Sequence, residues 1–290
     1  MNARARHEAR AAYAMLTPSL IGVGLFLLVP VLGVLALSFL NWDLISTPRW
    51  AGLANYAHIF TSGQFLNSMG VTVAFTVLTI PTAIALGLLL ALAINRRLPG
   101  TSWLRVLYVL PWVSAPLALG VVWKWLLDPS YGAVNALLGR RVEWLTDPQL
   151  ALPSVVFVQV WSTVGYISLF FLAGLQQIPT SVYEAATLDG AGRVRMLRSV
   201  TLPLLRPTMF FVTVTSVIAS FQVFDSIYAM TRGGPAFRTD VIASRIYDEA
   251  FMNLRLGRAA AMAVVLFAVL VLITLIQQRY FRRRITYDMS

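Results

Sequence analysis

The sequence predicts an all-α integral membrane protein with six transmembrane helices. Of its 290 residues, 58% are hydrophobic and only 12% are charged, and several long stretches carry no charged residue. Soluble domains carry about 25% charged residues, whereas a spanning helix needs about 20 consecutive, mainly apolar residues. The composition therefore excludes an ordinary soluble globular protein and a disordered chain.

Six apolar segments could each cross a bilayer. The first is about 25 residues long, which exceeds the 7–15 residues of a signal-peptide core, so a retained span is favoured over a cleaved signal. The third and fifth are short, and flanking residues would extend them to bilayer length. In chain order, the expected spans are roughly 15–40, 67–94, 106–123, 153–176, 207–224 and 259–278.

The positive charge of the chain agrees with this topology. The formal net charge is +11, and Lys124 is the only lysine. Six spans place both termini on one side, together with the segments near 95–105 and 177–206. That side holds fourteen basic and four acidic residues, so the positive-inside rule assigns both termini to the cytoplasm. Membrane topology then explains the charge better than nucleic-acid binding does. The basic residues are Arg4, Arg6, Arg10, Arg96, Arg97, Arg105, Arg193, Arg195, Arg198, Arg206, Arg279, Arg282, Arg283 and Arg284, and the acidic ones are Glu8, Glu184, Asp189 and Asp288.

No internal repeat or low-complexity segment divides the chain. We expect a cytoplasmic N-terminal tail over 1–14, a six-helix transmembrane domain over 15–279 and a cytoplasmic C-terminal tail over 280–290. The absence of cysteine excludes disulfides, thiolate metal sites and a cysteine nucleophile. The only two histidines, His7 and His58, are too few for a histidine-rich metal cage.

The segment 178–203, between the fourth and fifth spans, is the most informative. Ser181-x-x-Glu184 matches a capping box, which predicts a helix start near Val182. Gly190 stands where that helix would stop. A second short helix is expected over 192–200, with Pro203 opening the fifth span.

The residues of this segment allow two interpretations. The first is an amphipathic connector at the membrane surface, whose arginines Arg193, Arg195 and Arg198 face lipid phosphates. The second is a docking element, because Ala185 and Ala186 leave a small-residue surface that another protein could approach closely.

The spacing of this segment resembles the EAA loop of ABC importer permeases. The matching residues are Glu184-Ala185-Ala186, Asp189-Gly190-Ala191 and Leu202-Pro203. Val194 and Leu197 depart from the aromatic residues usual in that loop. Other segments resemble carbohydrate permeases of the maltose and glycerol-3-phosphate type over nearly the whole chain. They are Trp42-Asp43, Gly52-Leu53-x-Asn55-Tyr56, Phe221-x-x-Phe224-Asp225, Thr231-x-Gly233-Gly234-Pro235, Tyr247-x-x-Ala250-Phe251 and Ala259-Ala260-Ala261-Met262-Ala263.

This resemblance implies the type I ABC importer permease fold, with EAA coupling helices on the cytoplasmic side of a bacterial inner membrane. It implies three kinds of protein partner: a second, homologous permease that completes a heterodimer, two copies of a cytoplasmic ATPase, and an extracytoplasmic solute-binding protein. Nucleic acid is not among the expected partners. The residues implied in ATPase coupling are Glu184, Ala185, Ala186, Asp189, Gly190, Leu202 and Pro203.

The residues agree independently that ATP is handled elsewhere. A phosphate-binding loop needs the pattern G-x-x-x-x-G-K-[ST], but Lys124 lies between Trp123 and Trp125. We therefore expect no catalytic residue, metal or cofactor in this chain, and ATP with magnesium on the partner ATPase.

Polar residues within the fourth and fifth spans are the candidates for solute contact, because mid-span polar groups usually face a cavity or another helix. Aromatic faces with amide and hydroxyl groups suit a sugar, although serine and threonine also commonly bond between helices. Ser216, Ser220 and Val223 are expected on one helix face. Asp225 is expected to be structural and to pair with Arg232 or a partner chain. The candidates are Gln159, Trp161, Thr163, Tyr166, Ser216, Ser220 and Gln222.

Three other functions remain as alternatives. An importer of glycerol-3-phosphate or a glycerophosphodiester would have the same motifs, although the spans carry no central arginine for a phosphate. A membrane enzyme would need an acidic or metal cluster, whereas the acids are scattered and only Asp248 and Glu249 are adjacent. An ATP-independent secondary transporter usually carries ionisable groups near the membrane midplane, and no acid lies in the middle of a span.

Overall fold

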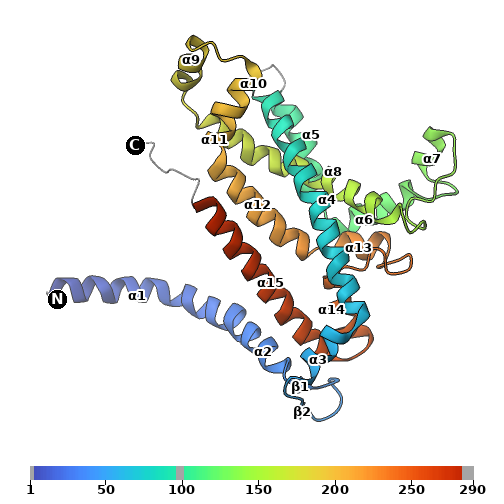
Figure 1. Cartoon of the computed structure of the whole chain (residues 1–290). Coiled ribbons are helices and arrows are strands. Elements are labelled where there is room, and N and C mark those ends of the chain that lie inside the picture. Colours follow the sequence, from blue (N-terminus) through green and yellow to red (C-terminus); the bar gives the residue numbers. More distant parts are fainter. Residues whose placement is uncertain (1–2, 96–100, 283–290) are drawn as a thin grey trace. The chain divides into compact units, whose positions relative to one another are not determined.

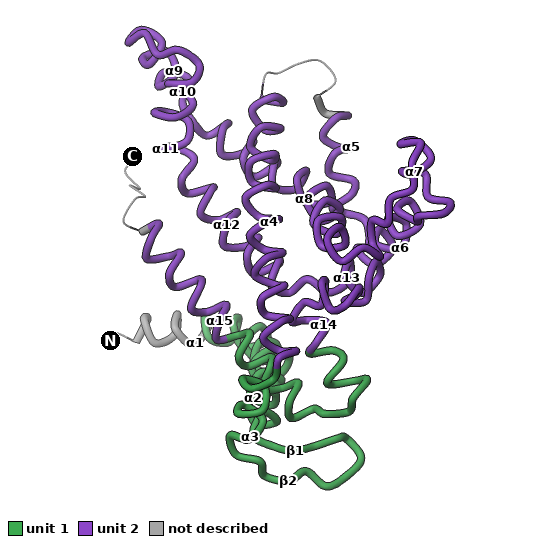
Figure 2. The backbone as a smooth tube through the Cα atoms, turned by 45° about the vertical axis from the view of Figure 1, so that its right-hand side comes forward, with its two compact units in different colours: residues 1–62, 246–267 green, residues 63–245, 268–290 purple. Residues whose placement is uncertain are grey.

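The computed structural model describes residues 3–95 and 101–282, with side chains over 12–95 and 103–281 (Figure 1). Arg96, Arg97, Arg283, Arg284 and most of the expected 280–290 tail lie outside the described residues. The chain divides into two compact units (Figure 2), one formed by residues 1–62 and 246–267 and the other by residues 63–245 and 268–290.

The elements up to residue 176 include three long helical segments, Ala12–Leu37, Gly63–Ile94 and Ala151–Gln176. In chain order, the elements are α1 (Ala3–Val23), the π-helical segment η1 (Gly24–Leu28), α2 (Val29–Leu37), strands β1 (Leu40–Asn41) and β2 (Arg49–Trp50), α3 (Ala54–Thr61), α4 (Gly63–Ile94), α5 (Thr101–Val113), α6 (Pro116–Leu126), α7 (Ala133–Leu138) and α8 (Ala151–Gln176).

The elements after residue 176 begin with short helices. They are α9 (Thr180–Leu188), α10 (Arg193–Met196), the π-helical segment η2 (Leu197–Thr201), α11 (Leu202–Leu204), α12 (Arg206–Phe221), α13 (Asp225–Met230), α14 (Ile242–Tyr247), the π-helical segment η3 (Asp248–Met252) and α15 (Leu256–Arg282).

The expected six spans are present, but two of them are broken. Within the described residues, Ala12–Leu37, Gly63–Ile94, Ala151–Gln176 and Leu256–Phe281 are each long and apolar enough to cross a membrane. Trp103–Val113 with Pro116–Leu126, and Arg193–Leu204 with Arg206–Phe221, are helix pairs bent by 94° and 68°. Six spans result when each bent pair counts as one.

The third span differs from the single helix expected over 106–123. Helix α5 ends at Val113, Ala115 is extended with φ −61° and ψ 121°, and Pro116 opens α6. A proline ring clashes with a helical residue before it and pushes that residue towards extended backbone. Ala115-Pro116 therefore breaks the segment.

The fifth span begins at Arg206, close to its expected start at 207, but Pro203 does not open it. Pro203 lies inside the three-residue helix α11 and does not open the span. Helix α12 starts at Arg206 and carries Pro207 in its first turn, where a missing backbone N–H costs nothing. The predicted role of Pro203 was therefore wrong, because Pro207 takes that position.

In the first unit, the loop that follows the first span is held by side chains of the predicted external motif. The amide of Asn55 donates to the carbonyls of Ser38 and Leu40, each at 2.9 Å, and the Leu256 N–H donates to the Trp42 carbonyl. The Ser46 N–H donates to Asp43 Oδ1 at 2.7 Å and contributes most to holding the pKa of Asp43 below its usual value. The residues of this motif therefore stabilise the conformation of the loop.

The second unit is built around helix α8, which packs against α4, α5 and α12. One apolar cluster joins these helices near the end of α8 and includes Ala91, Phe171, Leu175 and Leu205. A second cluster lies towards the beginning of α8 and includes Phe75, Val155 and Ile227. Glycines allow the close crossings, since a Cβ at Gly174 would meet Thr208 Oγ1 at 2.5 Å.

A buried ion pair that was not predicted from the sequence lies at the beginning of α14. Side chains of α4 bond to both of its charged groups. Arg245 Nη2 donates to Asp240 Oδ2 at 2.6 Å, and both residues are almost fully buried. The hydroxyl of Ser68 on α4 donates to the same carboxylate oxygen at 2.7 Å, and Gln64 Oε1 accepts from Arg245 Nη1. Each buried charge thus has several hydrogen-bond partners, which offset the cost of its burial.

The crossing of α5 and α8 gives a direct test of this packing. A Cβ at Gly165 would overlap the backbone carbonyl of Tyr108. We expect Gly165→Ala to destabilise the purified protein by about 1–3 kcal/mol, since backbone must shift to make room. The measurement is the thermal unfolding midpoint in detergent. Gly70→Ala is the matched control, because Gly70 has open space around it. Equal midpoints for both variants would contradict the described crossing.

Candidate functional site

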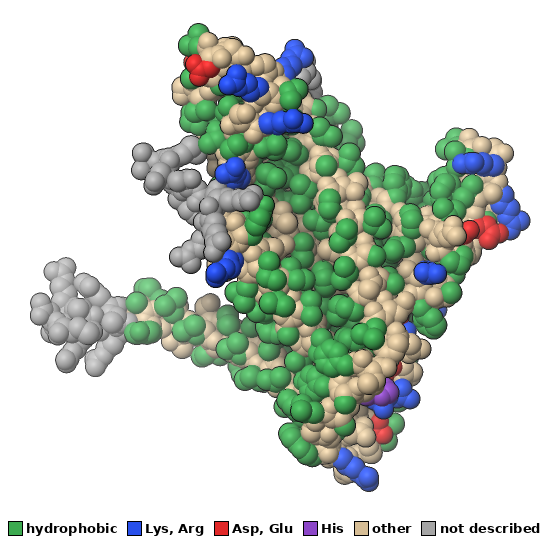
Figure 3. All heavy atoms as spheres, in the orientation of Figure 1, with side chains coloured by type: hydrophobic (Ala, Val, Ile, Leu, Met, Phe, Trp, Pro, Cys, Tyr) green, Lys and Arg blue, Asp and Glu red, His purple; other side chains and the backbone are tan. Residues whose placement is uncertain are grey.

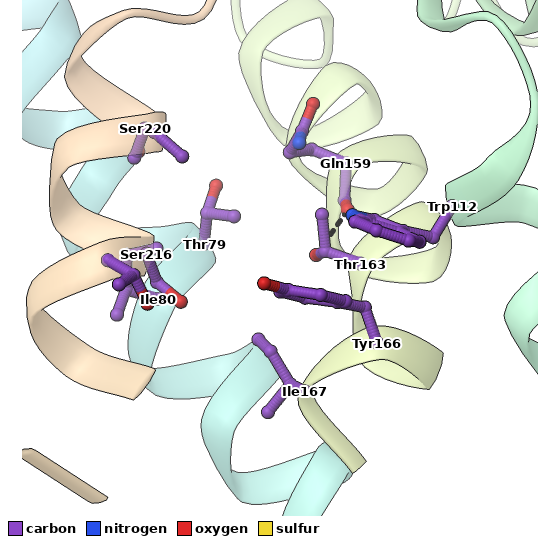
Figure 4. A pocket seen from close by; sticks show the side chains of 11 residues that line it. Thr79, Ile80, Trp112, Gln159, Thr163, Tyr166, Ile167, Ser216 and Ser220 are labelled. Carbon is purple, nitrogen blue, oxygen red and sulfur yellow. Dashed lines mark hydrogen bonds between the residues drawn. The ribbon is translucent and has the colours of Figure 1, made fainter. Parts of the chain in front are cut away.

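A pocket of about 220 Å³ lies between α4, α8 and α12 (Figure 4). We call it the α4–α8–α12 pocket. None of its described lining side chains is acidic or basic, and most of them carry a hydroxyl, an amide or an aromatic ring. The lining residues are Thr79, Ile80, Trp112, Gln159, Thr163, Tyr166, Ile167, Thr215, Ser216, Ala219 and Ser220.

Five of the seven predicted solute-path residues meet in this pocket. Gln159, Thr163 and Tyr166 are spaced i, i+4, i+7 on α8, so they share one face of that helix. Ser216 and Ser220 face them from α12, as Figure 4 shows. The fold therefore brings these predicted side chains of α8 and α12 together.

The other two candidates lie elsewhere. Trp161 is on a different face of α8, where its ring meets the ring of Trp123 edge-on at 5.2 Å. Gln222 caps the end of α12 and is exposed. Val223 lies beyond that helix, so its expected place on the face of Ser216 and Ser220 was wrong. Helix α12 ends at Phe221, which the periodicity could not indicate.

The polar groups of the pocket are partly committed to the protein. The hydroxyls of Thr76 and Ser220 lie 2.9 Å apart and join α4 to α12. Ser226 Oγ donates to Gln159 Oε1 at 3.3 Å. Thr163 Oγ1 donates to the backbone carbonyl of Gln159, the bond drawn in Figure 4. The amide nitrogen of Gln159 and the hydroxyls of Tyr166 and Ser216 supply further polar groups around the cavity.

An aromatic stack forms one side of the pocket. The rings of Trp112 and Tyr166 are 4.2 Å apart and nearly parallel, and the Phe170 ring meets Tyr166 edge-on at 4.9 Å. Trp112 is the second-last residue of α5, beside the break in the third span. Trp112 and Thr79 were not predicted, because they lie outside the fourth and fifth spans, from which the candidates came. The nearby Ala115-Pro116 break was the available signal for Trp112.

The second candidate region is the α9–α11 loop, residues 178–205. Its arginines Arg193, Arg195 and Arg198 are exposed, and Figure 3 shows basic side chains gathered in this region. Glu184, Ala185, Asp189 and Gly190 are also exposed, whereas Ala186, Leu202 and Pro203 are half-buried. The loop therefore presents most of its predicted coupling residues at the surface.

The predicted helix–turn–helix is present in this loop, but the capping box is not. Helix α9 begins at Thr180 after Pro179, with no side-chain cap, so Ser181 lies inside the helix. Pro179 has extended backbone, which already separates α9 from α8. The end of α9 agrees with the prediction, because Gly190 adopts φ +75°.

The turn after α9 is a Schellman motif. The Ala191 N–H donates to the Ala186 carbonyl at 2.9 Å, and the Gly190 N–H donates to the Thr187 carbonyl at 3.0 Å. This geometry needs a residue in the left-handed region, which glycine adopts without steric cost.

The inner face of α9 is anchored to the helices beside it. Val182 and Tyr183 pack against the apolar cluster that contains Leu175 of α8 and Leu205. Thr201 Oγ1 lies 3.5 Å from the Tyr183 hydroxyl and connects α9 to η2. The same cluster includes Val212 of α12, so α9 packs against the two helices that contribute most of the pocket lining.

Across the described residues, no three His, Cys, Asp or Glu side chains are grouped as metal ligands. Asp225 is exposed at the start of α13. The Arg232 guanidinium lies over the Tyr228 ring, 5.4 Å from its centroid, and the expected pairing of Asp225 with Arg232 or a partner chain stays a prediction. The Gly-Gly-Pro segment is held by Thr239, whose hydroxyl donates to the Gly234 carbonyl.

Comparison with known proteins identifies the family to which the chain belongs. A family model described as "Binding-protein-dependent transport system inner membrane component" matches residues 62–287. The chain belongs to this family. It is a multi-pass membrane protein and the permease subunit of an ABC importer, as the resemblance implied.

The sequence similarity to individual relatives covers almost the whole length of this permease. It is 36% identical to the sn-glycerol-3-phosphate transport system permease protein UgpA of Agrobacterium fabrum, over 95% of this chain and 96% of that one. It is 34% identical to the trehalose/maltose transport system permease protein MalF of Thermococcus litoralis, over 96% and 95%.

A solved structure agrees with the fold. A chain of a bacterial alginate ABC transporter, crystallised in complex with an alginate pentasaccharide-bound periplasmic protein, superposes with a TM-score of 0.84. The two chains are 26% identical, with 97% of this permease and 96% of that chain covered. The type I importer fold with six spans is thereby confirmed.

The Schellman turn provides a test of the α9–α11 loop. We expect Gly190→Ala to lower solute uptake about tenfold, since a Cβ in the left-handed region costs about 1–2 kcal/mol and displaces the end of α9. Uptake into cells, corrected for the amount of permease in the membrane, is the measurement. Gly192→Ala is the control, because Gly192 has φ −69° and open space. Equal uptake by the Gly190→Ala and Gly192→Ala variants would contradict a role of this turn in transport.

Proposed function

We propose that this permease imports a neutral sugar or a similar polyhydroxylated solute, in an ATP-driven complex. The observation that carries the proposal is the pocket lining, which combines hydroxyls, an amide and an aromatic stack without an acidic or basic side chain. Aromatic faces suit the C–H surfaces of a sugar ring, and amide and hydroxyl groups suit its hydroxyls. Trehalose, maltose and alginate transporters among the similar proteins support a carbohydrate.

The proposed complex contains a second, homologous permease, two copies of a cytoplasmic ATPase and an extracytoplasmic solute-binding protein. Each permease forms half of the translocation path. ATP and magnesium bind to the ATPase, and this chain binds no cofactor. Both termini and the α9–α11 loop face the cytoplasm of a bacterial cell, in agreement with the exposed arginines of that loop. The proposed domain boundaries are those of the sequence analysis, with the transmembrane domain over 15–279.

In the proposed mechanism, α9 binds in a cleft of the ATPase. The residues of this contact are Glu184, Ala185, Ala186, Asp189 and Gly190. Leu202 and Pro203 hold the end of the loop that leads back to α12. Closure of the ATPase would displace α9, and the packing of α9 on the ends of α8 and α12 would pass that displacement to the pocket. The pocket would then open alternately to the two sides of the membrane as the helices move as rigid bodies.

A phosphorylated cargo is the second candidate. Several relatives, including the Agrobacterium fabrum protein, are sn-glycerol-3-phosphate permeases with 36% identity. A phosphate, however, is usually bound by arginine, lysine or a helix N-terminus, and the described lining includes no arginine or lysine.

Uptake measurements distinguish the two cargoes. In cells that lack the native permease, we expect the reintroduced chain and its partners to import labelled neutral mono- and disaccharides, with maltose and trehalose in the panel. We expect no uptake of sn-glycerol-3-phosphate, because the uncharged pocket cannot repay the cost of dehydrating a phosphate. Uptake of the phosphate alone would overturn the neutral cargo, and uptake without ATP would overturn the ATP-driven mechanism.

Glu184→Lys tests the proposed coupling to an ATPase. We expect uptake to fall to background and the ATPase to be lost from the complex purified in mild detergent, because the charge of the docking helix is reversed. Membrane insertion should persist, since Glu184 is exposed. Glu143→Lys is the matched control: Glu143 is exposed in another loop, 3.7 Å from Arg141. Normal uptake by the Glu184 variant would remove the proposed role of α9.

A further inference from the structure

Helix α4 carries a row of polar side chains along one face. Ser68, Thr72, Thr76 and Thr79 are spaced by four, four and three residues, so they line up along the helix. All four are buried, with at most 7% of their surface exposed. Such a buried row on a membrane helix should find hydrogen-bond partners within the protein.

The first three members of the row do find such partners. Ser68 Oγ donates to Asp240 Oδ2 at 2.7 Å. Thr72 Oγ1 donates to the Ser68 carbonyl and accepts from the Ile242 N–H. The Thr76 hydroxyl bonds with that of Ser220 at 2.9 Å. These three residues therefore hold α4 against the neighbouring segments.

Thr79 breaks this pattern. It is 2% exposed, yet its hydroxyl has no hydrogen-bond partner. A helical threonine can bond to the carbonyl four residues before it, and Thr82, Thr163 and Thr215 all do so. The Thr79 hydroxyl makes no such bond, and it points into the α4–α8–α12 pocket (Figure 4).

We infer that Thr79 is a specificity-determining residue, whose hydroxyl bonds to a hydroxyl group of the transported solute. A buried hydroxyl without a partner is unfavourable, and Thr79 lines the pocket, so a solute in the pocket could supply the missing partner. Across the pocket lie Gln159 and Tyr166, so a solute bonded to Thr79 would contact α4 and α8 at once (Figure 4). The inference rests on the proposed import of a polyhydroxylated solute and adds helix α4 to its recognition.

Replacing the hydroxyl by a methyl group of similar size tests this assignment. In the full complex in membrane vesicles, we expect Thr79→Val to lower the uptake efficiency of the imported neutral sugars about three- to tenfold, the range for one lost hydrogen bond. Thr79→Ser should restore uptake. Thr82→Val is the matched control, because Thr82 is exposed on the same helix and bonds to the Leu78 carbonyl.

Mono-deoxy forms of maltose and trehalose show whether the contact is direct. With unsubstituted permease, we expect one deoxy position to weaken uptake. With Thr79→Val, the same deoxy sugar and its parent should be taken up equally, because the hydrogen bond is already absent. If the deoxy position lowers uptake by the same factor in Thr79→Val as in the unsubstituted permease, a direct contact is overturned.

Thermal unfolding without solute provides a readout that needs no cargo. We expect Thr79→Val to unfold at the same temperature as the unsubstituted protein or higher, since no protein bond is lost. Thr76→Val should unfold at a lower temperature, because it leaves Ser220 without its partner. A lower midpoint for Thr79→Val, or uptake equal to that of Thr82→Val, would overturn the inference and leave the proposed cargo intact. If the unsubstituted complex imports none of the neutral sugars, the proposed cargo fails, and the assignment of Thr79 fails with it.

Discussion

The apolar contact between α9 and the ends of α8 and α12 is the interaction on which the rest of the structure depends. Val182 and Tyr183 pack on the cluster formed by Leu175, Ile178 and Leu205. Well-packed interiors transmit displacement because they contain few voids into which side chains could yield. The two helices that leave this cluster also contribute eight of the eleven described pocket residues. A soft junction here would leave the surface loop and the pocket mechanically independent.

Much of the architecture could be predicted, because a helix that spans a lipid bilayer must be long and apolar. Apolar length located all six spans, although it could not show where a span bends. The i, i+4, i+7 spacing of Gln159, Thr163 and Tyr166 placed them together, since one continuous helix carries all three. The turn at Gly190 was also predictable, because a left-handed residue ends so many helices.

The errors came where local signals competed. Ser181 and Glu184 match a capping box, but Pro179 already sets the backbone that starts α9. Pro203 and Pro207 each suit the first turn of a helix, and nothing local indicates which one opens α12. The hydroxyls on α4 depend on long-range packing: Ser68 bonds to Asp240 and Thr72 to Ile242, which are 172 and 170 residues away. Periodicity within one helix carries no information about such partners.

The uncharged lining of the pocket has an electrical consequence. Moving one elementary charge across a membrane potential of 100 mV involves about 2.3 kcal/mol. A neutral solute that crosses between side chains without formal charge moves no net charge, so the resting potential of the cell neither drives nor opposes its passage. Accumulation against a gradient would then depend on nucleotide hydrolysis alone, and import would continue at the same energetic cost in a depolarised cell.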